Sequence, residues 1–216
     1  HAQSAPPLLS RLTGGGALNA SLIDVPADIS SAAFFLVGAA IANHSHITLN
    51  HVGINPTRDG VLTILRLMGA DITVHNERLM GGEPIAELSI GSAPLHGIHI
   101  PEHLVPLAID EFPALFIAAA CATGETVLTG AHELRVKESD RIAVMADGLT
   151  ALGIDCTVTD DGIRIQGKGS AAAVFSGGTV DSHGDHRIAM SFAMASLRAS
   201  APITILDCAN VNTSFP

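Results

Sequence analysis

One pattern recurs three times along this chain and limits its fold more than any other feature of the sequence. Each copy begins with an Asp and continues as a run of small and apolar residues, at 28–40, 110–122 and 185–197. Counted from the Asp, the fourth, seventh and eleventh positions are small or apolar in every copy, which predicts a helix with one packing face. The Asp stands where an N-cap residue is expected.

The segments between these copies also repeat. Each predicted helix is followed by a run rich in β-branched residues that is typical of a strand, at 47–49, 126–128 and 203–205. In the first two copies a second helix follows, ending at Gly69 or Gly153, and then a further strand. We therefore expect an α/β (α+β) fold: a pseudo-threefold lobe of βαβαββ units with buried helices and surrounding sheets. On pattern alone, an ordinary doubly wound α/β sheet is the alternative.

Units this short cannot close a hydrophobic core alone, so the three should pack together as one lobe over residues 1–216. We expect the units at approximately 20–100, 101–170 and 171–216. The third stops at Pro216, where its second helix should begin. Residues 8–12 resemble the end of a second helix without its beginning. These two features lead us to expect further segments of the natural chain at both ends.

Charge and composition exclude several classes of protein. The net charge is −10, with only two Lys and nine Arg, so the basic stripe that binds nucleic acid is missing. No apolar run reaches the roughly 18 residues of a membrane span. We therefore expect no nucleic-acid or membrane partner. The three widely spaced Cys suggest reduced thiols in a cytoplasmic protein. A few Arg in a cleft can still bind a small anion.

The densest charged segment, residues 135–141, lies between a predicted strand and a predicted helix. Within it Lys137, Glu138 and Arg141 could supply a donor, an acid/base and a phosphate clamp. The start of a helix also favours anions. The alternative is a solvated charged loop.

Charged residues also open two of the repeated helices. His186 could move a proton near neutral pH and Arg187 could hold a carboxylate, unless Asp185 only caps the helix and both are surface residues. Of Asp110 and Glu111, one could cap its helix while the other acts as a base, or the pair could only cap. The repeat implies that all helix starts gather at one face. That face would contain Asp110, Lys137, Glu138, Arg141, His186 and Arg187.

Eleven His raise the possibility of a metal site. The close pairs are His44 with His46, His96 with His99, and His183 with His186. None has the i, i+4 spacing with a carboxylate that marks a metalloprotease helix. We expect most of these His at the surface, and neither a metal nor an organic cofactor.

Five segments, spread in order over the chain, resemble the signatures of EPSP synthases. The match is carried by residues 24–31, 53–58, 134–141, 184–190 and 211–216. The resemblance implies an enolpyruvyl transferase-like fold with two lobes of three βαβαββ units each and the substrates between them. It also implies transfer of the carboxyvinyl group of phosphoenolpyruvate to the 5-hydroxyl of shikimate 3-phosphate, releasing phosphate. This chain resembles the C-terminal part, so the N-terminal partner lobe would be absent from it.

The resemblance also implies roles for individual residues. Asp110 would contact the shikimate 5-hydroxyl and act as its base, and Lys137 would contact that hydroxyl and the reacting centre. Glu138 would exchange a proton with the methylene carbon of phosphoenolpyruvate. Arg141 and Arg187 would hold phosphoenolpyruvate, and His186 is the adjacent site histidine.

Three further expectations come from the resemblance. Glyphosate should compete with phosphoenolpyruvate. Because the grip on shikimate phosphate belongs to the other lobe, this chain alone should be inactive or nearly so. Some relatives carry Asn in place of Glu133 and Lys in place of Thr213, so the roles of these two residues stay open. The alternatives are an enolpyruvyl transferase acting on UDP-N-acetylglucosamine and a non-catalytic anion-binding module.

Overall fold

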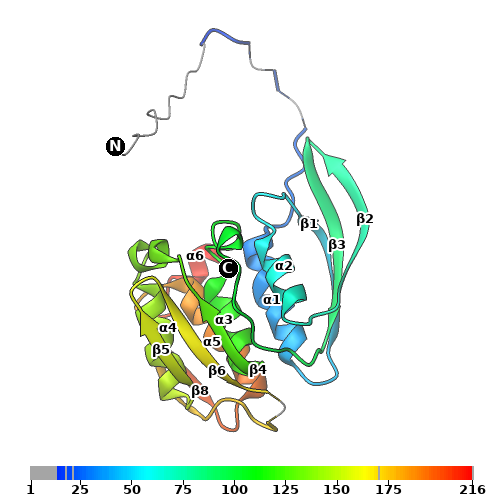
Figure 1. Cartoon of the computed structure of the whole chain (residues 1–216). Helices are drawn as coiled ribbons and strands as arrows, with labels where there is room; N and C mark the ends of the chain where they lie inside the picture. Colours follow the sequence, from blue (N-terminus) through cyan, green and yellow to red (C-terminus); the bar gives the residue numbers. More distant parts are fainter. Residues whose placement is uncertain (1–13, 18, 21, 170, 216) are drawn as a thin grey trace, which may run out of the picture.

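The computed structural model describes residues 14–17, 19–20, 22–169 and 171–215 (Figure 1). Residues 8–12, compared above with a helix end, lie outside this part. The first unit contains α1 (Ile29–Ile41), β1 (His46–Gly53), α2 (Gly60–Leu67), β2 (Ile72–Met80) and β3 (Glu83–Gly91). The second contains η1 (Glu102–Leu104), α3 (Phe112–Cys121), β4 (Thr123–Leu128), η2 (His132–Val136), α4 (Arg141–Ala151), β5 (Asp155–Thr159) and β6 (Gly162–Lys168). The third contains β7 (Gly178–Asp181), α5 (His186–Ala195), η3 (Ser196–Arg198), β8 (Ile203–Leu206) and α6 (Val211–Ser214).

The sheets show that the first two units share one topology and that the third shares its first crossover. The first two form sheets of order β1-β3-β2 and β4-β6-β5, with the middle strand antiparallel to both neighbours. The segment before the first helix also bridges in parallel to the strand after it, as Ala27 does to Val52 and His99 to Val127. In the third unit this contact is the parallel ladder between β7 and β8. The strand–helix–strand crossover thus occurs three times, and the predicted pseudo-threefold α/β fold is confirmed.

Three helices, one from each unit, form the centre of the lobe. α1, α3 and α5 pack against one another, and Figure 1 shows the two large sheets on opposite sides of the helices. Every residue of α3 is buried, because its Ala, Leu, Ile and Phe side chains are apolar on all sides. In α1, Phe35 is the clear exception and contacts the ring of Phe215. No helix in the described part of the chain is long and apolar enough to cross a membrane.

The helix starts follow the predicted capping in two units and depart from it in one. Asp28 accepts a hydrogen bond from the N–H of Ser31 at 2.9 Å, and Asp185 accepts one from the N–H of Arg187 at 2.9 Å. The prediction for Asp110 was wrong. Helix α3 begins one residue later than the pattern suggested, so Glu111 occupies the N-cap position, and its side chain makes no capping bond.

The predicted helix ends are confirmed at both glycines. Gly69 follows α2 with φ of +101°, and Gly153 follows α4 with φ of +82°. Only glycine adopts this left-handed conformation without a steric penalty, so the two helices stop at the same point of their units.

Gly148 tests how closely the units pack. A Cβ at this position in α4 would lie 2.3 Å from Cζ of the buried Phe192 in α5, whereas a Cβ at Gly38 in α1 would meet the flexible end of Met194 at 2.9 Å. We expect Gly148→Ala to lower the free energy of unfolding in urea by about 1–3 kcal/mol through overpacking. Gly38→Ala, the matched control, should cost less, because the flexible end of Met194 can move away from the added methyl group whereas the buried ring of Phe192 cannot. Equal stability of the two variants would contradict this packing.

Candidate functional site

Charged side chains from distant parts of the sequence meet at the amino ends of α3, α4 and α5. Asp110 lies just before α3, and the loop between η2 and α4 carries Lys137 and Glu138. Arg141 opens α4, and His186 and Arg187 open α5. Contacts of 4 Å or less join five of these residues, and the sixth, His186, precedes Arg187 and lines the same cavity as Arg187. The structure therefore gathers the six residues that the repeat predicted on one face.

Arg141 is the centre of this cluster. Its side chain is 1% exposed, and its Nε donates to Oδ2 of Asp185 at 2.8 Å. Its Nη2 donates to Oε2 of Glu138 at 2.6 Å, and its Nη1 to Oδ1 of Asp110 at 3.4 Å. A buried guanidinium is tolerated only when its donors are paired, so these carboxylates hold Arg141 in one orientation.

Asp185 does more than cap its helix. The residue is fully buried, and the same carboxylate accepts bonds from Arg141, from Ser139 and from the N–H of Arg187. Burial alone would raise the pKa of Asp185, but the hydrogen bond and charge of Arg141 outweigh it and hold the pKa below its ordinary value. Asp185 therefore stays ionised and ties the start of α5 to α4.

Lys137 and Asp110 form a half-buried ion pair beside this fully buried one. The Nζ of Lys137 lies 2.6 Å from Oε1 of Glu133 and 3.5 Å from Oδ1 of Asp110. The hydrogen bond to Glu133 raises the pKa of Lys137, and Asp110 adds to the effect. Burial would raise the pKa of Asp110, but the charges of Arg187, Lys137 and Arg141 together lower it. Asp110 is therefore a carboxylate at neutral pH, available as a hydrogen-bond acceptor.

Arg187 and His186 complete the cluster on the side of α1. The Nη1 of Arg187 donates to the carbonyl oxygen of Asp110 at 3.2 Å, and its Nη2 lies 3.9 Å from the Asp110 carboxylate. Burial, with the charge of Arg187, lowers the pKa of His186, so this imidazole is neutral at neutral pH. A cavity of about 350 Å³ opens beside them, between the amino ends of α1 and α5, where Ser30 and Ser31 line it.

Sequence reasoning did not predict the contacts of two acidic residues in the cluster. Glu111 is 4% exposed, accepts a hydrogen bond from Ser30 Oγ and has a pKa raised by burial, which no local pattern indicates. Glu133 was left without a role, although its spacing of four residues from Lys137 could have indicated the pair.

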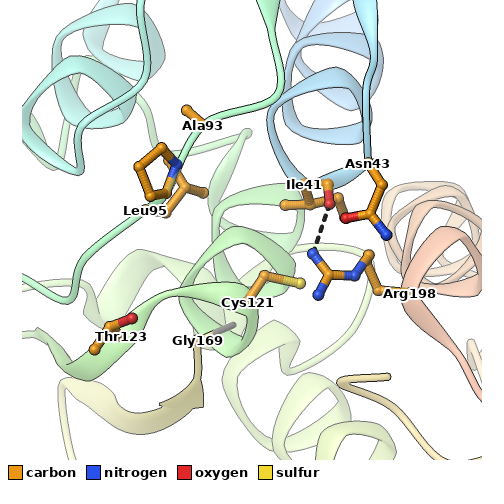
Figure 2. Close-up of a pocket in the computed structure, with 9 residues that line it drawn as sticks. Ile41, Asn43, Ala93, Leu95, Cys121, Thr123, Gly169 and Arg198 are labelled. Atoms are coloured by element: carbon orange, nitrogen blue, oxygen red, sulfur yellow. Dashed lines mark hydrogen bonds between the residues drawn. The ribbon is translucent and has the colours of Figure 1, made fainter. Parts of the chain in front are cut away.

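A second cavity, of about 200 Å³, lies at the opposite, carboxyl ends of the central helices (Figure 2). Its lining includes Ile41 at the end of α1, Cys121 at the end of α3, and Arg198. Arg198 donates to the carbonyl oxygens of Ile41 at 2.8 Å and Ala171 at 2.7 Å. Burial raises the pKa of Cys121 to about 12, so its thiol stays protonated and unreactive. Acid–base groups gather at the amino ends, and not here.

Within the described ranges, no group of three or more His, Cys, Asp or Glu side chains is arranged to hold a metal ion. The carboxylates of the cluster can transfer protons, and its Arg and Lys side chains can bind anions.

The chain is similar to known proteins over most of its length. The sequence model of the family described as EPSP synthase (3-phosphoshikimate 1-carboxyvinyltransferase) matches residues 7–216. A 3-phosphoshikimate 1-carboxyvinyltransferase from Alkalilimnicola ehrlichii is 69% identical over 205 residues, which cover 95% of this chain and 45% of the relative. An EPSP synthase structure from Acinetobacter baumannii has a TM-score of 0.92 at 65% identity, covering 95% of this chain and 47% of that one.

A more distant structure shares the fold alone. The enolpyruvyl transferase NikO from Streptomyces tendae has a TM-score of 0.63 at 20% identity, over 87% of this chain and 40% of that one. This chain spans about half the length of the curated relatives it matches.

Asp185→Asn tests the buried ion pair, because Asn keeps the N-cap and removes only the charge. Breaking a buried pair leaves a charge uncompensated, so we expect a loss of about 3–5 kcal/mol in the free energy of unfolding. The exposed pair of Glu125 with Arg164 is the control, and Glu125→Gln should cost less than about 1 kcal/mol.

The same variant has a pH signature. Because folding lowers the pKa of Asp185 below its ordinary 3.8, the stabilisation is fully present above that value and is lost as pH falls through the folded pKa. The stability difference between wild type and Asp185→Asn should therefore shrink in acid. A difference that is independent of pH in denaturation curves would refute the ion pair.

Proposed function

This chain belongs to the EPSP synthase family, and we propose that it forms one lobe of a 3-phosphoshikimate 1-carboxyvinyltransferase. Such an enzyme transfers the carboxyvinyl group of phosphoenolpyruvate to the 5-hydroxyl of shikimate 3-phosphate and releases phosphate. The observation that supports this best is the gathering of Asp110, Lys137, Glu138, Arg141 and Arg187 at three helix starts. Both substrates are anions, and the amino ends of helices favour anions.

We propose that residues 1–216 act as a single lobe of three units, at approximately 20–100, 101–170 and 171–216. The charged face would lie against a partner lobe that binds the phosphate group of shikimate 3-phosphate. The length relative to the family supports this, since the chain covers 45% of a typical relative. Each lobe would then carry part of the active site, and this chain alone would be inactive or nearly so. The three free cysteines support a cytoplasmic location.

Substrate binding is assigned to the two arginines. Arg187 is 17% exposed and can reach a ligand carboxylate directly. Arg141 is buried, and its Nη2 is paired with Glu138, which is 51% exposed. A carboxylate of phosphoenolpyruvate that bonded to Arg141 would compete with Glu138 for this nitrogen. Binding would then release Glu138 toward the substrate.

The remaining residues move protons. The reaction adds an alcohol across the enol double bond and then eliminates phosphate, so a proton must leave oxygen and another must reach carbon. Asp110, ionised beside three cations, accepts the proton of the 5-hydroxyl, and Lys137 stabilises the charge that develops on oxygen. Glu138 protonates the methylene carbon and takes a proton back when phosphate leaves. His186, neutral at neutral pH, adjoins this exchange. No cofactor is needed.

Glu138→Gln in the full-length enzyme tests this assignment. We expect kcat for formation of the enolpyruvyl product to fall by about 10²–10⁴-fold, because the proton on carbon loses its donor. Binding of phosphoenolpyruvate, followed calorimetrically, should persist, and glyphosate should compete with it.

Two outcomes would contradict the proposal. One is wild-type turnover with UDP-N-acetylglucosamine in place of shikimate 3-phosphate. The other is binding of phosphoenolpyruvate without turnover in either protein, which would identify a non-catalytic anion-binding module.

A further inference from the structure

Glu111 occupies a capping position and does not cap. At the matching points of the other units, the carboxylates of Asp28 and Asp185 accept an N–H of their own helix. The Glu111 side chain is one methylene longer and turns away from α3, whose second residue is Pro113. Its carboxylate accepts a hydrogen bond from Ser30 Oγ on α1. The carboxylate at this position caps a helix in the other two units, whereas the carboxylate of Glu111 links two units.

This contact is part of a series of polar side-chain contacts that runs through all three units. In the first unit, Nη2 of Arg58 donates to Oγ of Ser30 at 3.0 Å. The Ser30 hydroxyl donates in turn to Oε1 of Glu111 in the second unit. The same Oε1 lies 4.0 Å from Nη1 of Arg187 in the third unit. This series of polar contacts therefore ends at Arg187, a cation of the candidate site.

A buried carboxylate is not what packing alone would select. Glu111 is 4% exposed, and removing a carboxylate from water is costly unless charges or hydrogen bonds compensate. Ser30 is the only hydrogen-bond partner of its side chain within the described ranges, and Arg187 is the nearest cation. A large apolar side chain would fill the same space without that cost. We therefore attribute the burial of this carboxylate to its interactions with Ser30 and Arg187.

The geometry around Arg187 shows what Glu111 controls. Nη1 of Arg187 donates to the carbonyl oxygen of Asp110 and faces Glu111, so this nitrogen is held from two sides. Nε and Nη2 make no hydrogen bond to the described part of the chain. The guanidinium is thus held mainly at Nη1. Its Nε and Nη2 keep donors that can reach a ligand, although Nη2 also lies 3.9 Å from the Asp110 carboxylate.

We propose that Glu111 is a positioning residue, which with Ser30 orients Arg187 to receive the carboxylate of phosphoenolpyruvate. This inference rests on the proposed function, in which Arg187 binds that substrate. It makes the first unit, through Ser30 and Arg58, part of the phosphoenolpyruvate site. Small errors in the orientation of a binding group weaken an interaction strongly, so the effect should appear in substrate affinity.

The experiment is steady-state kinetics on the full-length enzyme with Glu111→Gln and Ser30→Ala. Glu111→Gln keeps the size of the side chain and removes the charge that faces Arg187. We expect the KM for phosphoenolpyruvate to rise by about tenfold, with kcat and the KM for shikimate 3-phosphate within about twofold of wild type. Ser30→Ala should change the same constant in the same direction. Because both substitutions act through the same series of contacts, the KM of the double variant should rise by less than the product of the two single increases.

Glu102→Gln is the matched control, since Glu102 is an exposed carboxylate that accepts a hydrogen bond from Thr129 outside the cluster. It should leave all constants unchanged. An active wild type whose Glu111→Gln variant keeps its KM for phosphoenolpyruvate, or loses only kcat, would overturn the positioning role and leave the proposed function intact. An inactive wild type would overturn the proposed function and this inference with it. If Glu111→Gln does not fold, Ser30→Ala decides by the same criterion.

Discussion

The buried guanidinium of Arg141 holds the charged face together. Its positive charge compensates the carboxylates of Asp185, which caps α5, and of Asp110, which precedes α3. Arg141 itself is the first residue of α4. Without this cation, carboxylates from different units would repel one another at close range. With it, three helix starts that are distant in sequence become one polar surface. Lys137 and Arg187 lie on the same surface, since both face the carboxylate of Asp110.

The direction of the helices makes this surface favourable for anions, although the net charge of the chain is −10. The amino ends of α3, α4 and α5 meet here, and the partial positive charge of each favours a negative ligand. At the carboxyl ends the polarity is reversed, and Arg198 donates to the terminal carbonyl of α1. The fold therefore gathers the acid–base groups at one end of the central helices, and overall charge does not reveal this arrangement.

The repeat allowed the helices, the strands and the gathering of six charged residues to be predicted, because each depends on periodic patterns or on symmetry. It did not predict where Asp110 and Glu111 would point. One additional residue before α3 moves the cap position from Asp110 to Glu111, and the longer side chain then reaches Ser30. Such contacts depend on the distance between units, which a pattern within one unit does not contain. The roles of the site residues in catalysis stay predictions.

A crystal structure of the full-length protein with phosphoenolpyruvate and shikimate 3-phosphate tests the central claim most directly. If the three helix starts form the reactive surface, the carboxylate of phosphoenolpyruvate will lie within hydrogen-bond distance of Arg187, with Glu138 beside the methylene carbon. Phosphoenolpyruvate bound away from these residues, for example in the cavity beside Arg198 and Cys121, would contradict the account.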